Sequence, residues 1–138
     1  MTTNTPNGEA SVNRRTSAVL IATSGRAHLM RVRALGPEMA VPLWLGIMAS
    51  DVAAQPVPNT NLLVMGDASR AAELRMVNVY ASELIAELFG AELSKIRGPV
   101  VFLGNEDDCP RLLTQDEAET AARDVLGIDP REHLTPSL

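Results

Sequence analysis

Apolar and polar positions along the chain follow two periods, which predict short strands and helices in turn. Residues 18–23 are rich in β-branched side chains, and Ser24-Gly25 is a turn signal. Residues 27–33 then alternate between two faces, with Arg31 and Arg33 on the same face. This stretch therefore predicts a β-hairpin whose polar face carries the two arginines.

A helix and a second hairpin are predicted next. Gly36-Pro37-Glu38 indicates a helix start, because proline at the first helical position has no N–H to lose and an acid suits the helix dipole. Residues 52–57 and 62–65 are two strands, and Pro56 and Pro58 indicate that the first of them lies at a sheet edge or ends there. The helix carries an apolar stripe, which we expect in the core rather than in a groove for a partner: Leu43, Trp44, Ile47 and Met48.

The second half of the chain carries clear helix boundaries. Asn78 is typical of an N-cap for a helix that ends at about Phe89 before Gly90, whereas residues 71–77 are extended or loop. Thr114 and Glu117 form a capping-box pattern that opens a helix to about Leu126. Between these helices the apolar run at 100–103 predicts a central strand, followed by an acidic loop over 104–110.

This order of elements predicts the α+β class. We expect a mainly antiparallel sheet built from two β-hairpins plus a central strand, with about three helices packed against it. Residues 1–16 are polar and predict a flexible N-terminal tail, because they offer too little apolar surface to offset the entropy of ordering. A single domain is predicted over 17–128, and a C-terminal tail over 129–138.

Three segments carry a likeness to a known family. They are residues 49–57 (ASDVAAQPV), the Gly66-Asp67-Ala68-Ser69 turn with the helix start at Asn78 and Ala81, and residues 94–101 (SKIRGPVV). Together they resemble domain-of-unknown-function family 3846, small uncharacterised proteins of actinobacteria and their phages. The likeness spans about Ser17 to Ala118, and it implies the fold and a mobile-element setting.

The chain departs from the family pattern at four positions. Ala49 and Ser50 stand where the family has glycines, Ala53 where it has a glutamate, and Ser94 where it has an aspartate. No role that depends on those acids is therefore carried over, and the family itself supplies no established activity.

Charge is unevenly distributed along the 138 residues, whose net charge is −5. Residues 1–75 hold seven basic and five acidic groups, a balance of +2, whereas 76–138 hold five and twelve, a balance of −7. We expect any contact with phosphate in the first half. The charge-free stretch from Met39 to Ser50 contains a proline and is too short to cross a bilayer. One cysteine and no secretory pattern favour a cytoplasmic protein.

Reactive side chains are few and scattered. His28 is expected on a strand and His133 in the terminal tail, and no histidine lies near Cys109 in the sequence. Glu106, Asp107 and Asp108 are consecutive, whereas calcium loops space their ligands at alternate positions. The sequence therefore does not support catalysis, and it predicts no metal site and no cofactor.

The candidate ligand-binding residues are Arg31, Arg33, Asn78 and Arg97. The two hairpin arginines form an electropositive group with Arg26 and the N-terminal arginines. Asn78 is first a helix cap, and its alternative role is to hold an anion at the helix start beside Arg75 or Arg97.

These observations predict a non-catalytic, cytoplasmic binding or accessory protein of phage or mobile-element type. Its expected partner is a host protein or a small anionic ligand, and no association with a membrane is expected. The alternative is a weak nucleic-acid-binding protein that uses the basic tail and hairpin. The negative net charge and the lack of stacking aromatics on these strands make nucleic acid the less favoured partner.

Overall fold

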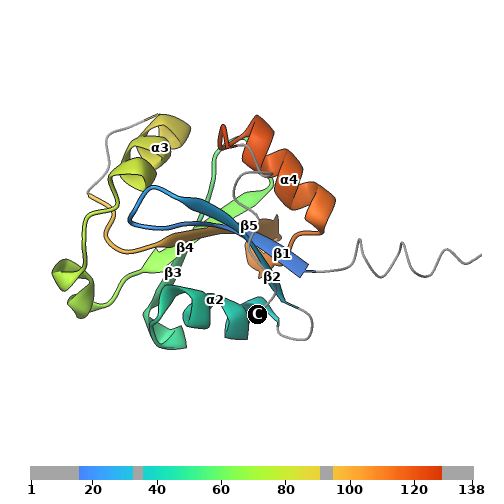
Figure 1. Cartoon of the computed structure of the whole chain (residues 1–138). Helices are drawn as coiled ribbons and strands as arrows, with labels where there is room; N and C mark the ends of the chain where they lie inside the picture. Colours follow the sequence, from blue (N-terminus) through green and yellow to red (C-terminus); the bar gives the residue numbers. More distant parts are fainter. Residues whose placement is uncertain (1–15, 33–35, 91–94, 129–138) are drawn as a thin grey trace, which may run out of the picture.

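The computed structural model describes residues 16–32, 36–90 and 95–128, which form a six-stranded antiparallel sheet with three α-helices (Figure 1). The predicted α+β class is therefore confirmed. The predicted tails lie outside the described residues, except that the first strand begins at Thr16. The strands are β1 (Thr16–Ile21), β2 (Ala27–Val32), β3 (Val52–Pro56), β4 (Leu62–Asp67), β5 (Val100–Glu106) and β6 (Cys109–Arg111). The helices are α2 (Pro37–Leu45), α3 (Val79–Phe89) and α4 (Gln115–Asp124), with short 3-10 turns η1 (Ala49–Asp51) and η2 (Arg70–Leu74).

Strand β5 lies at the centre of the sheet, as its apolar run predicted. The strand order is β2-β1-β5-β4-β3, and β6 pairs with the far end of β5, beyond its contacts with β1. Phe102 of β5 is fully buried and lies opposite Val19 on one side and Val64 on the other. Both faces of the sheet are covered at this central strand, so side chains that point to either face are apolar. This explains the unbroken apolar run at 100–103.

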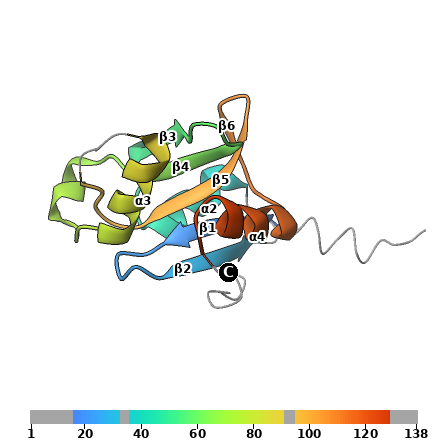
Figure 2. The ribbon, with the colours of Figure 1, turned by 90° about the horizontal axis from the view of Figure 1, so that it is seen from above.

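Helices cover both faces of the sheet (Figures 1 and 2). Val100 and Phe102 point into the core that α3 and α4 cover, whereas Val101 and Leu103 point into the core beneath α2. This alternation follows from the two-residue period of a strand. The result is two aliphatic cores separated by the sheet.

The predicted core stripe of α2 is wrong for two of its residues. Leu43 is 65% exposed and Met48 71% exposed, and the fully buried residues of α2 are instead Ala40, Val41 and Leu45. Leu43 is two positions from both Val41 and Leu45 and therefore lies on the opposite face of α2. For Met48 the reason is the helix end: Gly46 adopts a left-handed conformation with φ of 70° and stops the helix after Leu45. Met48 therefore lies beyond the helix, where helical spacing no longer sets its direction.

The predicted acidic loop over 104–110 is instead a tight hairpin between β5 and β6. Glu106 lies opposite Cys109, and Asp107 and Asp108 form the two-residue turn with φ of 54° and 65°. Such turns require positive φ at both positions and favour Asn-Gly or Asp-Gly, so an Asp-Asp pair gave no hairpin signal. The side-chain Oδ1 of Asn105 accepts a hydrogen bond from the Asp108 N–H at 2.8 Å and supports the turn.

This turn supplies a prediction with a definite sign. We expect Asp108→Gly to raise the free energy of unfolding by about 0.5–1 kcal/mol, because glycine adopts positive φ without a steric penalty. Asp108→Val should lower it by at least as much, since a β-branched side chain opposes that conformation. Urea denaturation measures both, and equal effects of the two variants would contradict the assigned turn.

Residues 71–77, which the sequence leaves open as extended or loop, contain most of a 3-10 turn and, at Val77, an isolated antiparallel bridge to Arg97. Arg70–Leu74 form η2, which is closed by a hydrogen bond from the Arg75 N–H to the carbonyl of Ala72 at 2.9 Å. The last helix, α4, ends at Asp124 rather than Leu126. Its predicted capping box between Thr114 and Glu117 is confirmed.

Strand β3 is an edge strand, as Pro56 and Pro58 predicted. The Val57 N–H donates to the Leu62 carbonyl, so odd-numbered residues of β3 turn their backbone groups toward β4 and even-numbered residues turn theirs outward. Of the outward residues, Val52 donates its N–H to the Ala49 carbonyl and Pro56 has none. Among the outward positions of β3, Ala54 is therefore the one whose N–H can still donate a hydrogen bond to another chain.

Candidate functional site

Asn78 is a structural residue of the α3 start. It is fully buried, and its Oδ1 accepts the Ala81 N–H at 3.0 Å, which confirms the predicted N-cap. Its Nδ2 donates to the carbonyls of Ile21 and Gly98, both at 3.0 Å. Both amide donors are thus used within the fold, and the side chain joins α3 to β1 and to the segment before β5. No solvent-facing group of Asn78 remains for an anion.

The structure separates Arg31 from Arg97. Arg31 lies on edge strand β2, at the opposite side of the sheet from β3, and it is half-buried with its Nε lacking a hydrogen-bond partner. Leu29, on the same face of β2, is buried in the core, so this face is not the polar face that the sequence predicted. Arg33 lies outside the described residues. Arg97, another of the four predicted residues, lines the pocket described next.

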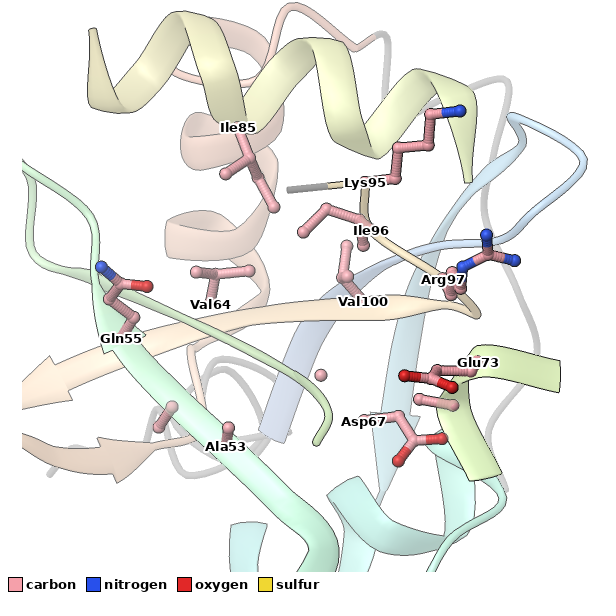
Figure 3. Close-up of a pocket in the computed structure, with 13 residues that line it drawn as sticks. Ala53, Gln55, Val64, Asp67, Glu73, Ile85, Lys95, Ile96, Arg97 and Val100 are labelled. Carbon is pink, nitrogen blue, oxygen red and sulfur yellow. The ribbon is translucent and has the colours of Figure 1, made fainter. Parts of the chain in front are cut away.

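A pocket of about 370 Å³ opens on the α3 side of the sheet, beside the edge of β3 (Figure 3). Val64 of β4, Val100 of β5, Ile85 of α3 and Ile96 give it an apolar lining. Its small and polar lining residues are Ala53, Ala54, Gln55, Gly66, Asp67, Ala72, Glu73, Lys95 and Arg97. The lining residues come from β3, β4, η2, α3, β5 and the segment before β5, so the pocket lies where these elements meet.

Two basic side chains stand at this pocket. Arg97 is half-buried and donates from Nη1 to the carbonyl of Arg75 at 3.0 Å, which fixes one side of its guanidinium and leaves its other donors available. Lys95 is exposed, and no described residue bonds to its ammonium group. Glu73 on η2 is likewise exposed and makes no ion pair with a described residue. The pocket therefore carries charges that the fold does not use.

Asp67, by contrast, is committed to the fold. Its side chain is 2% exposed and accepts hydrogen bonds from the Ser69 N–H at 2.8 Å and from Arg75 Nη1 at 3.1 Å. Arg75 also donates from Nη2 to the carbonyl of Leu45 at 3.0 Å. Burial raises the pKa of Asp67, but the hydrogen bonds from Ser69 and Arg75 outweigh it and hold the pKa below the ordinary value.

A second pocket, of about 430 Å³, lies between the β3–β4 turn and α4. Its basic residue, Arg111, donates two hydrogen bonds to the Glu117 carboxylate, at 3.0 and 3.2 Å. These bonds hold the pKa of Glu117 below its usual value, and they leave little charge for a ligand. The pocket beside Arg97 is therefore the better candidate site.

Sequence reasoning found Arg97 but missed Lys95 and Glu73. The pattern Lys95-Ile96-Arg97 just before a central strand was the available signal, because segments at strand ends often carry function. No local sequence pattern links Glu73 to Arg97, since it is the fold that brings both residues to the lining of one pocket.

The remaining candidate groups form no second site in the described part of the chain. Cys109 is exposed and unpaired with another cysteine. No three His, Cys, Asp or Glu side chains gather there in a way that suits a metal ion. Its helices are also too short or too polar to cross a membrane.

Comparisons with family models, with curated proteins and with solved structures give no match for this chain. The resemblance to family 3846 therefore stays a prediction.

Proposed function

We propose that this protein is a non-catalytic, cytoplasmic binding module of phage or mobile-element type, which holds a small anionic ligand in the pocket beside Arg97. The observation that carries the proposal is the pair of basic side chains, Lys95 and Arg97, at an apolar-lined pocket of about 370 Å³. The mobile-element setting rests on the sequence resemblance alone. The cytoplasmic location rests on the single cysteine of the sequence.

The pocket has the properties that a small-ligand site needs. Such sites combine an apolar lining with a few polar groups that fix orientation. Arg97 is held in place by its bond to the Arg75 carbonyl, so binding an anion costs less side-chain entropy there than at a free arginine. Arg75 is itself fixed by Asp67 and Leu45, which extends this support into the core.

A protein partner is the second candidate, and a different surface favours it. Met39 and Leu43 lie one helical turn apart on α2 and are 58% and 65% exposed. Two large apolar side chains adjacent on one helix face are suited to contact with another protein. This surface lies on the opposite side of the sheet from the pocket, so the two candidates do not compete for the same residues (Figure 1).

Isocaproate, an aliphatic carboxylate, is a suitable probe for the anion site. We expect it to shift the backbone amide signals of Val64, Ile96 and Val100 in a saturable way in an NMR titration. A double Lys95→Gln, Arg97→Gln variant should bind it about fivefold to tenfold more weakly, because each exposed charge contact contributes up to about 1 kcal/mol.

The matched control is Arg26→Gln with Arg123→Gln. Both arginines are exposed and neither lines the pocket, so this variant loses the same charge but should bind isocaproate as the wild type does. Equal weakening in both double variants would mean that net charge, not the pocket, drives binding. Circular dichroism checks that each variant is folded. The single variant Lys95→Gln tests the site while the hydrogen bond from Arg97 to the Arg75 carbonyl stays intact.

A further inference from the structure

We infer that the ligand of this pocket is a zwitterion: a small aliphatic molecule that carries both a carboxylate and an ammonium group. The inference rests on the proposed function, and it assigns Glu73 as the residue that receives the ammonium group. Lys95 and Arg97 receive the carboxylate.

The first observation is that opposite charges line one pocket without meeting. Glu73 comes from η2, whereas Lys95 and Arg97 come from the segment before β5. No ion pair joins them among the described residues. Figure 3 shows the Glu73 carboxylate below Arg97 and the Lys95 ammonium well above it, so the pocket has an acidic side and a basic side.

The second observation concerns which charges are still available. Asp67 also lines the acidic side, but Arg75 neutralises it through a direct ion pair at 3.1 Å. Glu73 has no such partner among residues 16–32, 36–90 and 95–128. A plain anion drawn to Lys95 and Arg97 would therefore meet an uncompensated carboxylate in the same pocket, and like charges repel. An ammonium group on the ligand turns that repulsion into attraction, which also selects against simple anions.

The third observation is the apolar lining beside the charged groups, which Figure 3 shows to the left of Arg97 and Glu73. Val64, Ile85, Ile96 and Val100 are aliphatic, and the other lining residues include no aromatic ring. Stacking with a planar ligand is therefore not available here. The lining suits a short aliphatic chain or branched side chain between or beside the two charged groups, as in an aliphatic amino acid.

The test compares ligands that differ by one charged group. L-leucine and ε-aminocaproate are the zwitterions, isocaproate and caproate lack the amine, and isoamylamine and pentylamine lack the carboxylate. NMR titration of the full chain with each measures the dissociation constants. We expect at least one of the two zwitterions to bind about threefold to fivefold more tightly than its matching carboxylate and amine, the gain expected from one exposed charge pair.

Glu73→Gln is the decisive variant, because Glu73 is exposed and its side chain makes no ion pair with a described residue that the fold would lose. This variant should bind the zwitterion threefold to fivefold more weakly and the matching carboxylate more tightly. The preference for the zwitterion is then lost. Glu83→Gln, an exposed α3 residue outside the pocket lining, makes the same charge change and should alter neither.

The outcomes separate this inference from the proposed function. If the carboxylates bind wild type as tightly as the zwitterions and Glu73→Gln changes nothing, the site takes simple anions and the inference is wrong. If no probe shifts the pocket amides, the inference is wrong together with the anion site. Tighter zwitterion binding that Glu73→Gln abolishes supports both.

Discussion

Replacing Asn78 with alanine is expected to lower the free energy of unfolding by about 3–4 kcal/mol. The substitution removes three hydrogen bonds of a fully buried side chain and leaves the Ala81 N–H and the carbonyls of Ile21 and Gly98 without this partner. Each lost bond contributes about 1 kcal/mol, and unsatisfied buried groups add to that cost. Urea denaturation followed by circular dichroism measures the change.

Three companion variants test the physical basis of this prediction. Thr114→Ala removes an exposed N-cap and should cost about 1 kcal/mol, so a similar value for Asn78→Ala would show that the two carbonyl contacts contribute nothing. Asn78→Asp keeps the cap acceptor but replaces the Nδ2 donor with an oxygen that faces two carbonyls, and it should destabilise at least as much at neutral pH. Asn61→Ala, at an exposed position, should stay within about 0.5 kcal/mol.

Replacing Arg75 with methionine is expected to cost about 2–3 kcal/mol at neutral pH. Methionine keeps much of the side-chain volume but leaves the carboxylate of Asp67, 2% exposed, without its ion-pair partner. Breaking a fully buried pair costs about 3–5 kcal/mol, and the expected loss is smaller here because the Arg75 side chain is 29% exposed. Denaturation midpoints at pH 7 give the value, and a loss below about 0.5 kcal/mol would contradict it.

The same pair sets a pH dependence with a definite sign. The folded pKa of Asp67 is lowered from its ordinary value of 3.8, so its stabilising contribution is present above that pH and is lost as the pH falls through the folded pKa. We therefore expect Asp67→Asn to destabilise the protein at pH 7, with a difference from wild type that shrinks in strongly acidic solution. Asp124→Asn, at an exposed position, makes the same charge change and should show no such convergence.

Elements with local signals could be predicted from the sequence. Asn78, the Thr114–Glu117 capping box and the run at 100–103 each place their signal within a few residues of the element that they define. Which residues of the α2 stripe are buried could not be predicted in the same way, because an apolar stripe shows which residues are hydrophobic but not where the helix ends. The left-handed Gly46 ends the helix before Met48, which is exposed.

The candidate site depends on contacts that no local pattern records. Arg75 reaches Leu45 across thirty positions of the chain, and Arg97 reaches Arg75 across twenty-two. Glu73 and Lys95 line one pocket because β4 and β5 pair in antiparallel fashion. This pairing places η2, which follows β4, near the segment that precedes β5. Arg97 was a candidate as a cation beside the helix start at Asn78, whereas the residues around it in the pocket required the sheet order.

The edge of β3 has a consequence for how copies of this protein meet. An exposed sheet edge is a template on which other chains can add strands and build aggregates. Here the outward donors are reduced to the Ala54 N–H, because Val52 is bonded to Ala49 and Pro56 has no donor. A second β3 aligned antiparallel through Ala54 would gain two backbone hydrogen bonds at that residue and meet a proline at its next pairing position. The strand that borders the pocket is thus protected against fibril-like stacking while its side chains remain open to a ligand.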